Sequence, residues 1–102
     1  MNNKIEIFEK NTQNIAVYVG GITDLGMYVP YLTVKKKTSD AVPILSKAGI
    51  VSDPSTTYMF ELTSEDTSIN VGDYVYDITL EQGTIKHTII KDVFSIIDTV
   101  RL

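Results

Sequence analysis

The chain has 102 residues, 43% of them hydrophobic and 22% charged, with a net charge of −4 and no cysteine. This size and composition predict one soluble globular domain spanning residues 1–102, and the lack of cysteine excludes disulfides and thiolate chemistry. The acidic balance argues against a nucleic-acid partner, because such binding depends on neutralising phosphates. No apolar run approaches the roughly 18 residues of a membrane-spanning helix, so no membrane partner is expected either.

The periodicity along the chain is two residues rather than 3.6, which is typical of β-strands with one buried face. Apolar and polar side chains alternate most cleanly from Asp73 to Leu80. No segment favours a helix. In chain order the pattern predicts about seven strands, at residues 4–8, 15–19, 31–35, 57–62, 73–80, 84–91 and 93–98.

Glycines mark two of the expected connections between strands. Gly20-Gly21 ends the second strand pattern. Glu81-Gln82-Gly83 lies between two strand patterns and predicts a hairpin, with Gly83 free to adopt a positive φ.

The segment 38–56 has no clear alternation and is long for a connection in a compact domain. It contains Pro43 and Gly49, and an apolar patch made of Ile44, Leu45, Ile50 and Val51. Two interpretations stay open, because long loops are often functional. The segment is either a short irregular strand or sheet crossover that covers one end of the core, or an arm that binds a partner.

A local motif sharpens the fold prediction. Tyr74 follows Gly72 at the start of the cleanest strand pattern. In immunoglobulin-like (Ig-like) sandwiches a tyrosine at this place packs inward, and its hydroxyl group bonds to backbone a few residues upstream. Tyr76, two residues later, is then a core position. We therefore predict an all-β fold, a single Ig-like antiparallel β-sandwich of about seven strands.

The residues needed for catalysis or metal binding are scarce. His87 is the single histidine, and its alternation with Lys86 and Thr88 predicts a partly buried structural residue. One histidine cannot build a zinc site, which takes three or four protein ligands. Asp73 and Asp77 share a strand face but are about 13 Å apart on an extended strand, too far to share a calcium ion. We predict no enzyme activity, no metal and no cofactor.

Tyrosines are the richest resource for surface recognition, since tyrosine combines rigid contact area with a polar tip. Tyr74 and Tyr76 are expected in the core, whereas Met27, Tyr28 and Tyr31 around Pro30 are candidates for an exposed contact patch. Core packing is the alternative role for each of them. The predicted partner-binding residues are thus Met27, Tyr28, Tyr31, Ile44, Leu45, Ile50 and Val51.

The last third of the chain carries a family resemblance. The run Phe60-Glu61-Leu62-Thr63, the pair Asp66-Thr67 and the strand Val71–Leu80 resemble small β-sandwich domains of tailed-bacteriophage virion proteins. The matching positions continue at Gly83, Thr88-Ile89-Ile90, Phe94-Ser95-Ile96 and Thr99-Val100-Arg101. Two positions depart from the pattern. Lys91-Asp92 stands where those proteins have glycine, and Thr99-Val100 reverses the usual order.

The resemblance implies a non-enzymatic virion protein whose partners are capsid, fibre or tail subunits in a large multi-copy assembly. The small size resembles an auxiliary capsid (decoration) or adaptor protein, as in crAss-like phages, located in the virion after assembly in the bacterial cytoplasm. The alternative is a carbohydrate- or host-receptor-binding β-sandwich module. A sugar site normally shows an aromatic platform beside clustered carboxylate or amide groups, and the sequence shows no such cluster.

Overall fold

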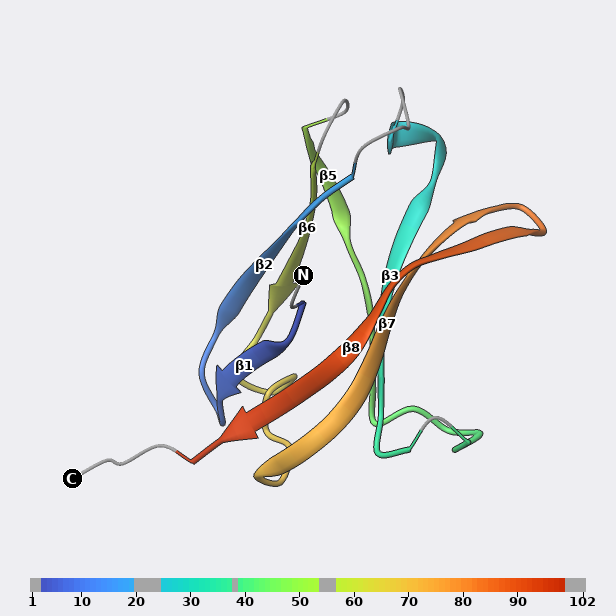
Figure 1. Ribbon diagram of the computed structural model, residues 1–102. Coiled ribbons are helices and arrows are strands. Elements are labelled where there is room, and N and C mark those ends of the chain that lie inside the picture. The colour runs from blue at the N-terminus through green and yellow to red at the C-terminus, as the bar shows by residue number, and fades with distance from the viewer. Residues whose placement is uncertain (1–2, 20–24, 38, 54–56, 99–102) are drawn as a thin grey trace.

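A computed structural model describes residues 3–19, 25–37, 39–53 and 57–98. Over these ranges the chain forms β-strands and one short 3-10 turn, packed as two sheets face to face (Figure 1). The all-β class and the sandwich-like layering are therefore confirmed. The expected break at Gly20-Gly21 and the closing run Thr99-Val100-Arg101 lie outside the described residues. The elements are β1 (Ile5–Phe8), β2 (Gln13–Tyr18), η1 (Leu25–Met27), β3 (Val29–Lys35), β4 (Leu45–Ala48), β5 (Ile50–Asp53), β6 (Thr57–Leu62), β7 (Gly72–Gln82) and β8 (Ile85–Ile97).

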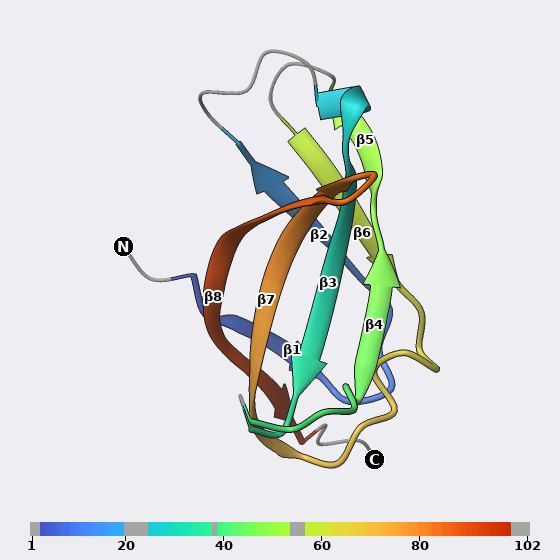
Figure 2. The ribbon, with the colours of Figure 1, turned by 90° about the vertical axis from the view of Figure 1, so that its right-hand side faces the viewer.

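The larger sheet has the strand order β1-β8-β7-β3-β4, and the smaller sheet has the order β2-β6-β5. Figure 2 shows β8, β7, β3 and β4 side by side, with the smaller sheet behind them. All neighbours pair antiparallel except β1 and β8, which are parallel from Ile5 opposite Phe94 to Phe8 opposite Ile97. The prediction of a purely antiparallel sandwich is wrong at this pair. Parallel neighbours need a long connection, and here it comprises all the strands from β2 to β7.

The last two predicted strands, 84–91 and 93–98, are one continuous strand. β7 has 11 residues and pairs with β8 from Gly72 opposite Ile96 to Gln82 opposite Ile85. The register shifts between Ile78 and Thr79, so that Ile89 is an extra residue in β8. Lys91 and Asp92 are paired in the ladder, opposite Asp77 and Tyr76, so β8 does not break there.

Segment 38–56 contains the short strands and the sheet crossover that its first interpretation predicts. β4 belongs to the larger sheet and β5 to the smaller one, and Gly49 is the single residue between them. The Gly49 amide donates a hydrogen bond to the Pro30 carbonyl at 2.9 Å. A Cβ at position 49 would be 2.8 Å from a ring carbon of Phe60, so only glycine lets the chain pass this close.

The core lies between the sheets, where alternate residues of each strand point inward. β3 buries Pro30, Leu32 and Val34, and its intervening residues are half-buried. The largest fully buried side chains include Tyr58 and Phe60 of β6 and Phe94 of β8. Burying each such side chain contributes about 1.5–3 kcal/mol. The buried hydrophobic set is Ile7, Val17, Leu25, Leu32, Val34, Tyr58, Phe60, Leu62, Tyr74, Tyr76, Ile78, Leu80, Phe94 and Ile96.

The tyrosine and hairpin predictions are confirmed. The Tyr74 hydroxyl donates a hydrogen bond to the Asn70 carbonyl at 2.6 Å, and the side chain is buried. Tyr76 is buried as well, with its ring edge-on to Phe94 at 6.3 Å between centroids and its hydroxyl bonded to the Asn3 carbonyl. Gly83 has a φ of 60° in the turn between β7 and β8.

Candidate functional site

His87 is exposed, so the prediction of a partly buried histidine is wrong. The β7–β8 hairpin runs past the body of the sandwich (Figure 1), and the histidine ring meets the edge of Tyr28 there, with 6.3 Å between centroids. Over the described residues, no group of three or more His, Asp or Glu side chains is placed to hold a metal ion. Helices long and apolar enough to cross a membrane are likewise not found in that part of the chain.

The first predicted contact patch divides between surface and core. Met27 in η1 is 54% exposed. Tyr28 is partly buried and packs against the core, whereas Tyr31 is half-buried on the outer face of the larger sheet, opposite Thr79. Met27 is thus the one member of the three that is largely exposed.

The second predicted patch divides in the same way. Leu45 lies opposite Val34 and packs against the core, and Val51 lies opposite Tyr58 and does the same. Ile44 and Ile50 are exposed, at 44% and 55%. Ile50 lies in β5 of the smaller sheet, whereas Ile44 immediately precedes β4 of the larger sheet, on the other side of the crossover at Gly49. The four apolar residues therefore do not form one continuous surface.

Ile44 and Leu45 line a hollow of about 550 Å³ at one end of the sandwich, together with Glu65, Asp66, Ile69 and Tyr74. Asp66 accepts hydrogen bonds from the Lys47 ammonium at 2.8 Å and from the Thr63 amide at 2.9 Å. Burial tends to raise the pKa of Asp66, but these hydrogen bonds outweigh it and hold the pKa below its usual value of 3.8. The ion pair ties β4 to the connection between β6 and β7.

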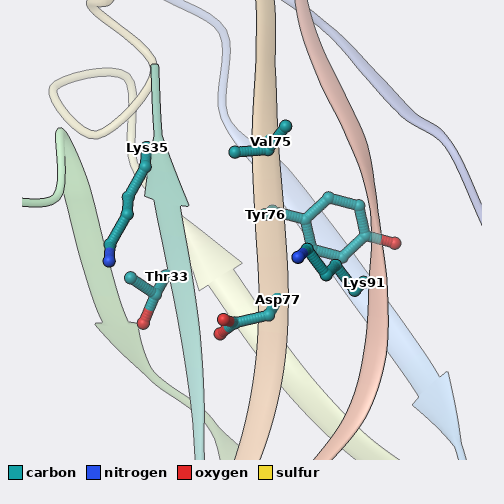
Figure 3. Close-up of a pocket in the computed structure, with 6 residues that line it drawn as sticks. All are labelled: Thr33, Lys35, Val75, Tyr76, Asp77 and Lys91. Carbon is teal, nitrogen blue, oxygen red and sulfur yellow. The ribbon is translucent and has the colours of Figure 1, made fainter. Parts of the chain in front are cut away.

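A small polar pocket of about 60 Å³ lies on the outer face of the larger sheet. Thr33, Asp77 and Lys91 are cross-strand neighbours on β3, β7 and β8, and Lys35 completes the charged lining (Figure 3). Asp77 forms no ion pair with either lysine in the described structure, although the Thr79 hydroxyl donates to it at 3.4 Å. Sequence reasoning missed this pocket because its residues meet only after three strands have paired.

A larger groove of about 280 Å³ opens along one side of the sandwich. Its walls come from the segment that leads into β1, from β2, and from β7 and β8. The alternation of residues along the strands carries no signal that this side of the sandwich is open. The lining residues are Asn3, Lys4, Ile5, Ile15, Ala16, Val17, Tyr18, Tyr76, Ile78 and Ile90.

The outer face of the smaller sheet carries an apolar row that was also not predicted. Ile50, Met59 and Ala16 are in register on β5, β6 and β2. Tyr18, two residues after Ala16 on the same strand, is 78% exposed. Ile50 is the one predicted partner-binding residue in this row, and we call the four side chains the outer apolar row.

Comparison of the chain with protein-family models, with curated proteins and with solved structures finds no match.

Proposed function

We propose that the protein is a non-enzymatic structural protein of a tailed-bacteriophage virion, an auxiliary capsid (decoration) or adaptor protein that docks on other virion subunits. The observation that carries the docking role is the outer apolar row. Side chains such as Ile50 and Tyr18 stay exposed on a regular sheet face, and exposed apolar patches of this kind mark interaction surfaces in soluble proteins. The partners are capsid, fibre or tail subunits present in many copies.

The strand arrangement supports an Ig-like classification. In Ig-like domains one sheet contains strands B, E and D and the other contains C, F and G, with C′ added in the variable type. The orders β2-β6-β5 and β8-β7-β3-β4 correspond to these sets, with β1 added beside the last strand. Tyr74, with its buried ring and its hydroxyl bonded to upstream backbone (the tyrosine corner), lies in the same stretch, residues 60–101, that resembles phage virion domains. Fold and resemblance thus favour the same class of protein.

The docking role is tested by exchanging apolar for polar side chains on the outer apolar row. We expect the double variant Tyr18→Ser/Ile50→Ser to fold normally, because both side chains are exposed, and to be lost from purified particles. Val42→Ser is the matched control, since Val42 is also 78% exposed but lies in the connection between β3 and β4. Wild-type incorporation of the double variant would show that the row is not the docking face.

A second candidate function is binding of an acidic glycan, and one observation favours it. Tyr31 lies on β3 two residues before Thr33, which lines the polar pocket, and it is opposite Thr79 on β7. The structure thus places an aromatic side chain on the same sheet face as the Asp77 carboxylate and the Lys91 ammonium. Titration of the labelled protein with glucuronate, followed by nuclear magnetic resonance, tests this function. Shifts confined to Tyr31, Asp77 and Lys91 would support it, and unchanged spectra would exclude this pocket as the glycan site.

A further inference from the structure

We propose that the open side of the sandwich is a strand-acceptor groove, in which an extended segment of a partner polypeptide pairs with β2 and inserts alternate apolar side chains between the sheets. This inference depends on the proposed docking role and specifies how one partner binds.

Two strand edges border the groove. β2 pairs with β6 over six consecutive residues, and no other described strand pairs with it. β1 covers the edge of β8 only from Phe94 to Ile97, so the described residues leave Ile85–Val93 uncovered on that side. An uncovered edge presents backbone N–H and C=O groups to any chain that can extend alongside it.

The two edges differ in how they are protected. Natural proteins block exposed edges with lysines, prolines or bulges. The uncovered part of β8 carries Lys86 and Lys91 and the bulge at Ile89. β2 reads Gln-Asn-Ile-Ala-Val-Tyr, has no charge and no proline, and keeps regular register along its whole length. β2 is therefore the edge that remains open to pairing.

The floor of the groove favours a bound strand that has an apolar side chain at every second residue. Ile15 and Val17 line it from β2, while Ile78 and Ile90 line it from the opposite sheet. Ile15 and Ile90 are only partly buried, although they pack against the core. A strand added beside β2 directs every second side chain into this space, because successive side chains point to opposite faces. Apolar residues at those positions would complete the burial of the two isoleucines.

Charge identifies the occupant further. The lining of the groove includes one cation, Lys4, and no carboxylate; the nearby Asp92 carboxylate already accepts a hydrogen bond from the Asn3 amide. A segment that carries a carboxylate beside its apolar positions is complementary to this lining. A second copy of this chain is a poorer partner, since two copies with a charge of −4 repel each other. The occupant is thus a segment of a different polypeptide.

The test uses the free protein and the synthetic peptide Glu-Val-Thr-Val-Thr-Val, with the same residues in the order Glu-Val-Val-Val-Thr-Thr as the control. At about 1 mM of the alternating peptide, we expect every second amide of Gln13–Tyr18, those that point away from β6, to exchange at least about tenfold more slowly, which corresponds to about 1.4 kcal/mol. The control peptide should give no such protection. Lys4→Glu should abolish the effect, whereas Lys10→Glu, which changes the net charge equally at a residue that does not line the groove, should retain it.

Unchanged exchange in β2, or equal protection by both peptides, would overturn the strand-acceptor inference. So would equal effects of the two lysine variants. None of these results bears on whether the protein is a virion component, because the measurement uses no particles. The docking role is decided separately by the composition of the particles.

Discussion

Tyr74 fixes the connection between β6 and β7 through its buried ring and its 2.6 Å hydrogen bond to the Asn70 carbonyl. Tyr74→Phe should lower the free energy of unfolding by about 1 kcal/mol, the net contribution of one hydrogen bond. Tyr74→Ala should lower it by about 3–5 kcal/mol, since it also leaves a cavity. Urea denaturation measures both values. Tyr18→Phe is the control, because that side chain is 78% exposed. If both Tyr74 variants were as stable as wild type, the buried ring and hydrogen bond of Tyr74 would not stabilise this connection.

Asp66 makes stability depend on pH on the acid side. Its folded pKa lies below the usual 3.8, so its contribution is present above that value and is lost as pH falls through the folded pKa. We therefore expect Asp66→Asn to be less stable than wild type at neutral pH, and the difference to shrink as pH falls below 3.8. Denaturation at a series of pH values measures it. A difference that does not change with pH would show that the Lys47–Asp66 pair contributes nothing through ionisation.

Tyr76 makes stability depend on pH on the alkaline side. Burial, assisted by the nearby Asp92 carboxylate, raises the pKa of Tyr76 from 10.0 to about 12. Because the folded pKa is the higher one, the contribution is complete below pH 10.0 and is lost as pH rises toward about 12. Tyr76→Phe should remove this part of the alkaline decline. Denaturation of the variant and of wild type between pH 10.0 and about 12 measures the loss of stability. Equal losses in the two proteins would show that Tyr76 is not its source.

The crossover at Gly49 is the most constrained connection among the strands. Gly49→Ala should destabilise the protein by about 1–3 kcal/mol, the usual cost of overpacking, because the added methyl group meets the Phe60 ring and Pro30. Ala48→Ser, one residue earlier and exposed, should leave stability within about 0.5 kcal/mol of wild type. Thermal and urea denaturation compare the two variants. A Gly49→Ala protein as stable as wild type would mean that β4 and β5 can separate from Phe60 without cost.

Strand β7 could be predicted from sequence because its alternation is regular and its inward side chains are buried. The sequence pattern divides β8 into two strands, on either side of Asp92. In the structure the Asp92 carboxylate accepts hydrogen bonds from the amides of Val93 and Asn3, so Asp92 stays within the strand. β4 and β5 have four residues each, too few for alternation to distinguish a strand from a loop.

The candidate surfaces were predictable only in part. Met27, Ile44 and Ile50 are exposed and remain docking candidates, whereas Tyr28, Leu45 and Val51 pack on the core. The alternation of apolar and polar residues shows which side chains share one face of a strand. It does not show whether another part of the protein covers that face. The outer apolar row, the polar pocket and the strand-acceptor groove each combine residues from three or more segments of the chain, and only strand pairing brings these together.

At the scale of the whole molecule, nine large apolar side chains of the described residues are at least 44% exposed. They are Phe8, Tyr18, Met27, Val29, Val42, Ile44, Ile50, Val71 and Ile85. Apolar side chains exposed singly are normal at a protein surface. The docking proposal therefore depends on the outer apolar row, where such side chains lie side by side on one sheet face.

Quantitative mass spectrometry of purified tailed-phage particles, assembled in a host that produces this chain, decides whether the protein is a virion component. We expect the protein to be retained through purification at a fixed, multi-copy ratio to the major capsid or tail subunits. Absence of the protein from the virions, or a trace amount that varies between preparations, would contradict the proposed structural role.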